Sequence, residues 1–150
     1  MMFQRKKRFG ATLVESAIVY PVTFLLLLGL LVGAMGIFRY QEMASLSREA
    51  ARYASVHGGK FAKDSGTPAP GASDIYNQVI VPKAAGLDLS LLSYSITWNT
   101  DNNPYHVKIV NGDVLPVTNT VTVTLAYRWI PEVIFGGVTL TSSSVMTMAY

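Results

Sequence analysis

The sequence predicts an α+β protein in which a long N-terminal helix packs on a small antiparallel β-sheet domain with one short extra helix. Residues 16–38, which lie between Glu15 and Arg39, form an uninterrupted run without a charged side chain. Residues 39–57 follow without a proline and are rich in alanine, a composition typical of a helix. Further along, residues 92–98 and 119–129 alternate between apolar and polar side chains, which is the pattern of half-buried strands.

The uncharged run is long enough to cross a membrane, because about 18 or more apolar residues in a helix span the bilayer core. Four basic residues at positions 5–8 precede it, and such residues beside an apolar helix remain in the cytoplasm. We therefore expect residues 1–10 to form a basic leader, residues 11–38 a transmembrane helix, and the later residues an extracytoplasmic domain. A removed secretory signal has a shorter apolar region of about 7–15 residues, so a spanning helix is favoured.

The apolar run contains residues that allow close contact between helices. Gly29 and Gly33 have the spacing of a small-xxx-small motif, which lets two helix backbones approach each other. Pro21 removes one backbone hydrogen bond and is tolerated in a membrane helix when neighbouring helices cover it. These three residues are therefore candidates for helix packing.

Residues 39–57 are expected to extend the same helix out of the membrane and to end it before Gly58-Gly59, giving one helix from about Thr12 to His57. Spacings of three and four residues line up one small-to-apolar stripe on this extension. The stripe consists of Tyr40, Met43, Ser47, Ala50 and Ala54. Such a stripe can seat the globular domain, adjacent subunits, or both.

The segment from residue 58 to 73 is rich in Gly, Pro, Ser and Ala and is expected to be a loop. Residues 74–150 are expected to form one short helix followed by an antiparallel sheet. Ser73 and Asp74 would cap the helix, which runs from residue 75 to 85 with Pro82 in its last turn. Asn111-Gly112 is a strong hairpin signal. The expected strands are residues 92–98, 105–110, 114–115 and 119–129, a glycine-centred hairpin of 133–135 with 138–140, and an edge strand in 144–149.

The composition excludes several kinds of function. The chain has no cysteine, and after the first ten residues eight basic side chains face nine acidic ones, which gives no basic surface for nucleic acid. Its two histidines, His57 and His106, have no carboxylate partner at metal-ligand spacing. The serines at 142–144 lack the glycine-flanked turn of a nucleophile. We therefore expect no enzyme activity, no cofactor and no metal.

A family resemblance rests on the first third of the chain. Basic residues followed by Gly10-Ala11-Thr-Leu-Val-Glu15 and a long apolar helix resemble the class III signal of type IV pilin-like proteins. More narrowly, the GATLVE start, the early Pro21 and the REAARYA ending at residues 48–54 are similar to the TadE-like pseudopilins of tight-adherence (Tad, or Flp) pili. Ser16 departs from the aromatic or aliphatic residue common after the glutamate, and residues from Gly58 onward carry no motif that matches.

The resemblance implies a structural role and a set of partners. A prepilin peptidase would cut between Gly10 and Ala11, and Glu15 would then pair with the new amino group of a neighbouring subunit. The protein would be a minor subunit that joins or primes a tight-adherence pilus for surface adhesion. Its partners would be the peptidase, other pilins and pseudopilins, the inner-membrane assembly platform and lipid, in a homo- or hetero-oligomer. It would reside in the inner membrane before reaching the pilus or cell surface.

Two other classes of function remain open from the sequence. If the chain keeps its first ten residues, it is a single-pass membrane-anchored binding protein outside the cytoplasm. Alternatively, the helix delivers an exported enzyme or a carbohydrate-binding module. The start of the mature chain separates the first alternative from a pilin, and ligand binding by residues 58–150 would support the second.

Overall fold

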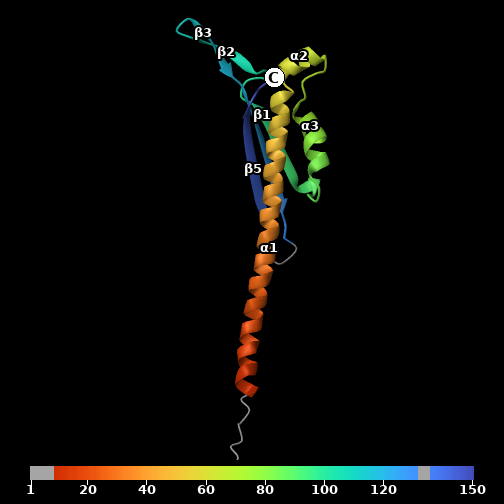
Figure 1. Cartoon of the computed structure of the whole chain (residues 1–150), viewed down its shortest axis with the longest axis vertical. Coiled ribbons are helices and arrows are strands. Elements are labelled where there is room, and N and C mark those ends of the chain that lie inside the picture. Colours follow the sequence, from red (N-terminus) through yellow and green to blue (C-terminus); the bar gives the residue numbers. More distant parts are fainter. Residues whose placement is uncertain (1–8, 132–135) are drawn as a thin grey trace, which may run out of the picture. The chain divides into compact units, whose positions relative to one another are not determined.

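A computed structural model describes residues 9–131 and 136–150 of the chain (Figure 1). The described residues form two units, one that ends at Ile37 and one that comprises Phe38–Tyr150. The helices are α1 (Phe9–Val56), α2 (Gly59–Ser65) and α3 (Ala72–Ile75), with a π-helical turn (Tyr76–Ile80) and 3-10 turns (Val81–Lys83 and Leu89–Leu91) after them. The strands are β1 (Leu92–Trp98), β2 (Tyr105–Val110), β3 (Asp113–Thr118), β4 (Thr120–Trp129) and β5 (Val138–Thr147). The α+β fold class is therefore confirmed.

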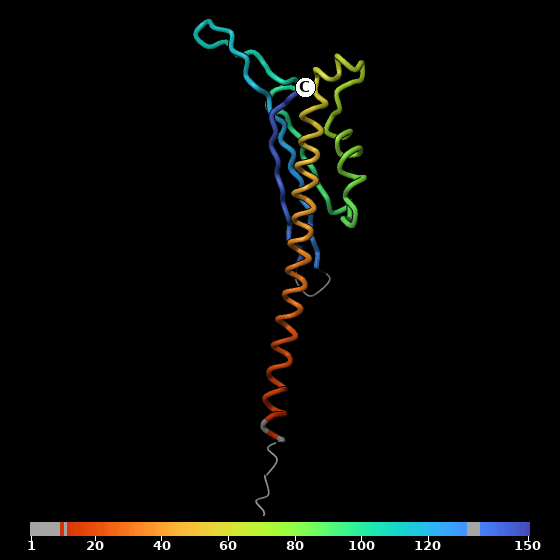
Figure 2. Tube along the Cα trace, in the orientation of Figure 1, coloured from red at the N-terminus to blue at the C-terminus, as the bar shows by residue number. Residues whose placement is uncertain are grey.

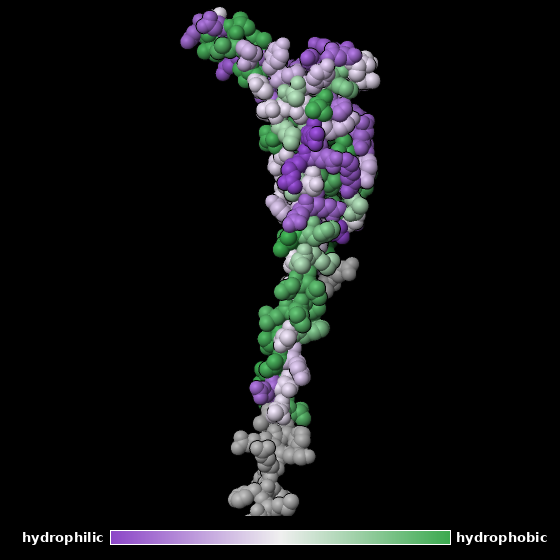
Figure 3. Space-filling view, in the orientation of Figure 1, coloured by the Kyte–Doolittle hydropathy of each residue, from purple (hydrophilic) through white to green (hydrophobic). Residues whose placement is uncertain are grey.

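Helix α1 runs without a break through Pro21 and over 48 residues. Up to Ile37 its large apolar side chains are exposed, as the green segment of the space-filling view illustrates (Figure 3). Leu26 is 69% exposed and Leu30 is 70% exposed. By length and composition this is the one helix of the described residues that can cross a membrane.

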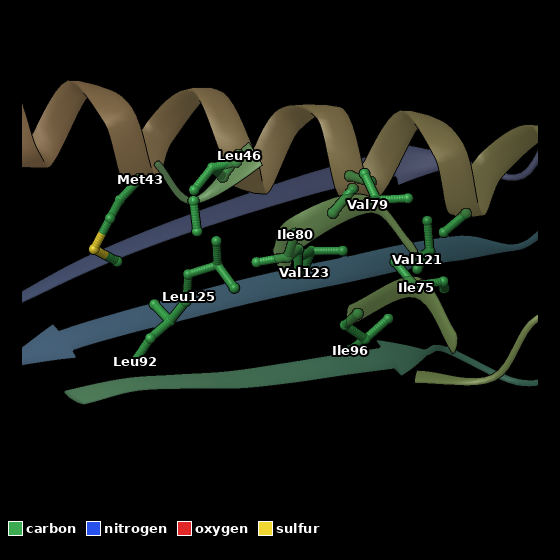
Figure 4. Packing of buried hydrophobic residues seen from close by; sticks show 14 of the residues in the cluster. Met43, Leu46, Ile75, Val79, Ile80, Leu92, Ile96, Val121, Val123 and Leu125 are labelled. Carbon is green, nitrogen blue, oxygen red and sulfur yellow. The ribbon is translucent and has the colours of Figure 1, made fainter. Parts of the chain in front are cut away.

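From Phe38 to Val56, α1 belongs to the second unit and packs on its sheet. The expected stripe is buried at Met43, Ser47, Ala50 and Ala54, whereas Tyr40 remains 47% exposed. Leu46 and Ala51 widen the buried face, because residues three and four apart share one side of a helix. The small side chains of this face allow the helix to lie close to the strands below it (Figure 4).

The sheet beneath α1 has the antiparallel order β1-β4-β5, so the strand in the centre is β4 (Figure 1). Val121, Val123 and Leu125 of β4 are fully buried and point toward the helix, as the alternation predicts. The register sets Ile96 of β1 opposite Val123, and Ser142 of β5 opposite Leu125. A helix on one face of an antiparallel sheet is the arrangement expected from the sequence.

The second β-structure is a separate two-stranded hairpin of β2 and β3 (Figure 2). It turns at Asn111-Gly112, and both residues have positive φ, at 55° and 91°. Positive φ at both central positions defines the two-residue turn that Asn-Gly favours. The Asn-Gly prediction is therefore confirmed, and the return strand is longer than residues 114–115.

The segment 58–73, expected to be a loop, contains helix α2. Lys60 to Ser65 include no glycine or proline, and Gly66 ends the helix in a left-handed conformation with φ 71°. Phe61 packs edge-on against His57, with ring centroids 4.7 Å apart. The composition of the whole segment concealed a short helix because Gly, Pro and Ser are concentrated on either side of it.

The short helix after this segment starts earlier than expected. Gly71 is its N-cap, and the Asp74 carboxylate accepts a hydrogen bond from the Gly71 amide at 2.9 Å, so Ser73 and Asp74 lie inside the first turn. Ile75, Val79 and Ile80 are buried in the core. The helix widens to a π turn and then tightens to a 3-10 turn, because Pro82 has no N–H with which to continue the ladder.

The last part of the sheet also differs from the expectation. Val138 to Thr147 form one strand that pairs with β4 along its whole length, rather than a short strand followed by an edge strand in 144–149. Ser142 at its centre faces inward and is buried, so the strand continues through the serines. The other expected strand, at 133–135, lies outside the described residues.

Candidate functional site

The residues expected to carry processing and assembly all lie in the first unit, on α1. Gly10 and Ala11 are in its first turn, and Glu15 follows one turn after Ala11. Gly10 and Glu15 are exposed, and a Cβ added at Gly10 would meet no atom within 4 Å. Within the described part of the chain, no side chain pairs with the Glu15 carboxylate. Glu15 is therefore the one charged side chain among residues 12–38, whose exposed side chains are mostly apolar.

Pro21 lies inside the continuous helix, one turn and a half after Glu15. Its ring nitrogen has no hydrogen, so the Ala17 carbonyl receives no helical hydrogen bond from it. The Thr23 hydroxyl donates to the Val19 carbonyl at 2.9 Å, a bond from i to i−4 that keeps this polar group satisfied on an apolar surface.

Gly29 and Gly33 are one turn apart and leave a bare strip of backbone. A Cβ at either position would meet no atom within 4 Å. Leu26 and Leu30 beside them are more than two-thirds exposed. The strip is thus geometrically open to another helix, which is the arrangement that a small-xxx-small spacing provides.

A second polar cluster, which the sequence did not predict, lies where the hairpin joins the sheet. Asn119 is fully buried and uses every polar group of its side chain. Its Nδ2 donates to Asp101 Oδ1 at 2.6 Å and to the Asn103 carbonyl at 2.9 Å. Its Oδ1 therefore accepts from His106 Nδ1 at 2.7 Å. Hydrogen bonds from the side chain of Asn103, and then from Asn119, hold the pKa of Asp101 below its usual value.

The end of α1 is a third place where chain segments converge. The Gly58 amide donates to the Tyr150 carbonyl at 3.0 Å, and the Gly59 amide donates to the Asn102 carbonyl. A Cβ at Gly58 would collide with the Tyr150 carbonyl oxygen. The sequence indicated these glycines only as a helix stop, whereas the structure requires them for close backbone approach.

The remaining polar side chains form no recognisable reactive centre. In the described ranges, no three His, Asp or Glu side chains lie where they could hold a metal ion. His57 stacks on Tyr53 with ring centroids 4.0 Å apart, and its Nδ1 lies 2.9 Å from the Tyr53 carbonyl. Ser142 Oγ lies 3.1 Å from Ser47 Oγ of α1 in a buried contact. These contacts explain His57 and Ser142 as parts of the fold.

The described residues thus combine one N-terminal apolar helix, long enough to cross a membrane, with a small α+β domain. In a comparison with protein families, residues 10–52 of the chain match the family model of TadE-like proteins. The resemblance seen in the sequence is therefore confirmed over this region. It implies a pilin-like protein associated with Tad pili, in a structural family rather than a family of enzymes. No curated protein and no solved structure matches the chain.

Proposed function

We propose that the chain is a structural subunit of a tight-adherence pilus, processed after Gly10 and then incorporated into the pilus or used to prime it. The observation that carries this proposal is the exposed Glu15, one turn after Ala11 on a mostly apolar helix surface. The region that matches TadE-like proteins includes both residues.

Assembly would remove the energetic cost of an unpaired Glu15 carboxylate in the membrane. An ionised, unpaired carboxylate in or near the hydrocarbon region costs a few kcal/mol. Cleavage after Gly10 creates an amino group on Ala11, four residues away in sequence. The same amino group on a neighbouring subunit can pair with Glu15 and remove that cost. Such a pair fixes the axial register of two subunits more than it adds stability.

Close packing of neighbouring helices completes the proposal. The bare strip at Gly29 and Gly33 admits a second helix, and a covering helix also shields the backbone around Pro21. The partners are then other pilins or pseudopilins, delivered through the inner-membrane assembly platform after a prepilin peptidase has acted. The N-terminus lies in the cytoplasm, the domain lies outside it, and the assembled pilus serves surface adhesion.

The first test is the N-terminal mass of the protein isolated from membranes and from sheared surface material. A chain that begins at Ala11 supports prepilin processing. A start near Met35 would indicate ordinary signal removal and a secreted domain. A start at Met1 or Met2 would identify an unprocessed membrane-anchored binding protein and overturn the proposal.

A second test separates assembly from anchoring. Glu15→Ala is expected to insert into the membrane normally but to reach the pilus fraction at least about tenfold less, since each 1.4 kcal/mol is a factor of ten. Glu15→Asp keeps the charge and should retain more assembly than Glu15→Ala. Glu49→Ala is the matched control, because Glu49 lies on the same helix but pairs with Lys83 of the domain. Equal assembly of all three variants would contradict the role of Glu15.

A further inference from the structure

The β2–β3 hairpin carries one face made entirely of uncharged and mostly apolar side chains. The register places Tyr105, Val107 and Ile109 opposite Thr118, Pro116 and Val114, and opposite residues share a face. Tyr105, Val107, Ile109 and Val114 are 60%, 58%, 71% and 65% exposed. At this exposure the face presents about 500 Å² of apolar surface, in the upper part of what a soluble monomer carries. The green patch on the hairpin is visible in Figure 3.

The hairpin is held firmly only at its base. The Asn119 side chain accepts a hydrogen bond from His106 Nδ1 and donates one to the Asn103 carbonyl. The backbone amide of Asn119 donates to the Pro104 carbonyl at 3.0 Å. Beyond that point the described residues supply no third strand to either edge. An isolated two-stranded ribbon is marginal in water and usually gains stability from a further strand or a covered face.

The two outer edges of the hairpin are not equivalent. In a two-residue turn the closing pair, here Val110 and Asp113, exchanges hydrogen bonds, and the following pairs alternate. The pair of Val107 and Pro116 is therefore one whose backbone nitrogens face outward. Pro116 has no N–H, so the outer edge of β3 lacks a donor at its centre, a common protection of edge strands. The outer edge of β2 keeps its donor at Val107 and has no proline.

A single open edge favours a second copy of the chain as the occupant. A continuous row of subunits needs two open edges, whereas a two-fold dimer uses the same edge of both copies. Antiparallel pairing centred on Val107 sets Tyr105 opposite Ile109 of the second copy, a favourable pair of an aromatic and a β-branched side chain. The pairing also sets the apolar faces of the two hairpins side by side on one surface of the joined sheet. Asp113 at the hairpin tip disfavours insertion into lipid.

We propose that the outer edge of β2 is a self-association edge, at which two copies pair antiparallel with Val107 at the two-fold axis. The product is a four-stranded sheet in the order β3-β2-β2-β3, with the apolar faces of both hairpins on one side. This contact uses the domain alone and does not depend on processing or on incorporation into a pilus.

Single cysteines test the contact, because the natural chain has none. Val107→Cys should give a reductant-sensitive dimer when the full-length protein, purified in detergent, is oxidised. Val114→Cys is the matched control, similarly exposed on the same face. In the proposed dimer its copies are three strand spacings apart, about 14 Å, beyond the reach of a disulfide. Cross-linking at residue 107 should exceed that at residue 114 at least about tenfold.

The register and the open edge have their own tests. Tyr105→Cys and Ile109→Cys should cross-link when the two variants are mixed, and neither should do so alone. Adding Val107→Pro to both variants should abolish the mixed cross-link, because it removes the outward donor without touching the bonds between β2 and β3.

Two outcomes would contradict the self-association of the β2 edge. Equal cross-linking at residues 107 and 114 would indicate random collision and overturn the proposal. A solvatochromic dye attached to the thiol of the Val107→Cys variant provides the second readout. No cross-link at residue 107, with a blue shift of this dye when phosphatidylethanolamine and phosphatidylglycerol vesicles are added, would assign the face to lipid instead. Because the measurement uses purified protein, these outcomes are independent of where the mature chain begins.

Discussion

The two parts of α1 deal with apolar surface in opposite ways. Up to Ile37 the helix carries large apolar side chains on every side and leaves them exposed, as at Leu26. From Phe38 onward it buries a face of small and apolar side chains, such as Ala50, against the sheet. Its exposed charged residues are Arg48, Glu49 and Arg52. The same helical backbone is thus matched to two environments, a lipid or helix partner for the first part and a protein core for the second.

The largest difference is expected when the same substitution, leucine to alanine, is made in each region. Leu125→Ala, beneath the second part of α1, should destabilise the domain by about 2–5 kcal/mol because it leaves a cavity in a fully buried site. Leu27→Ala, at a side chain 58% exposed, should leave domain unfolding unchanged. Urea unfolding of the full-length protein in detergent, followed by tryptophan fluorescence, measures both. Equal losses would mean that the two regions unfold as one unit.

The next test reverses the sensitivity of the two parts. Leu27→Arg should impair membrane integration by about 3 kcal/mol, the cost of arginine at the centre of a spanning helix. Val56→Arg adds the same charge at a position 40% exposed at the end of α1 and should integrate like the wild type. The membrane fraction that resists alkaline extraction reports the difference. Normal integration of Leu27→Arg would contradict the membrane assignment.

The same difference is expected for one added methyl group at a glycine of each region. Gly58→Ala should cost about 1–3 kcal/mol through overpacking, since its Cβ would meet the carbonyl oxygens of Tyr150 and Asn102. Gly29→Ala places the same methyl group in open space and should not change domain stability. The urea midpoints of the two variants provide the measurement, and a midpoint for Gly58→Ala at the wild-type value would show that the junction adapts.

The smallest expected effect is that of pH on the free energy of unfolding of the domain. The pKa of Asp101 is lowered from 3.8 by hydrogen bonds from Asn103 and Asn119, so its stabilisation is present above the unfolded pKa. The stabilisation is lost as the pH falls through 3.8 toward the lower folded value. Asp101→Asn should flatten the pH dependence of unfolding in this range. Asp88→Asn should flatten it as well, because hydrogen bonds from Ser90 lower the Asp88 pKa in the same direction. An unchanged pH dependence in both variants would contradict this prediction.

The sequence predicted the elements that nearby residues specify. The uncharged run, the stripe at Met43 and Ala50, the alternation along β4 and the Asn-Gly turn each have a local cause, and each was correct. Helix α2 was missed because its six helix-forming residues are short compared with the glycine and proline around them. The prediction of two separate strands in place of β5 was wrong. The pairing of β5 with β4, which no local pattern specifies, keeps the strand continuous and turns Ser142 inward.

The polar cluster and the hairpin surface were beyond sequence reasoning for a different reason. Asn119 joins residues 16 to 18 positions away, and no local pattern specifies which polar side chains will meet. Likewise, the pattern of residues 105–110 predicts a strand but not what covers it, and Tyr105, Val107 and Ile109 are exposed in the described structure. The assembly residues on α1 could be placed on one helix from sequence, but their roles still depend on contacts with other subunits.

The contact between Ser55 and the last strand has a consequence for the order of folding. Ser55 Oγ donates to the Thr147 carbonyl at 2.5 Å, and the Ser55 carbonyl accepts from the Ala149 amide, across more than ninety residues. Contacts so distant in sequence form slowly, because a long loop must close first. The Ser55 end of α1 therefore stays unpaired until β5 has been synthesised. During that interval the growing chain depends on its earlier β1–β4 pairing to limit aggregation.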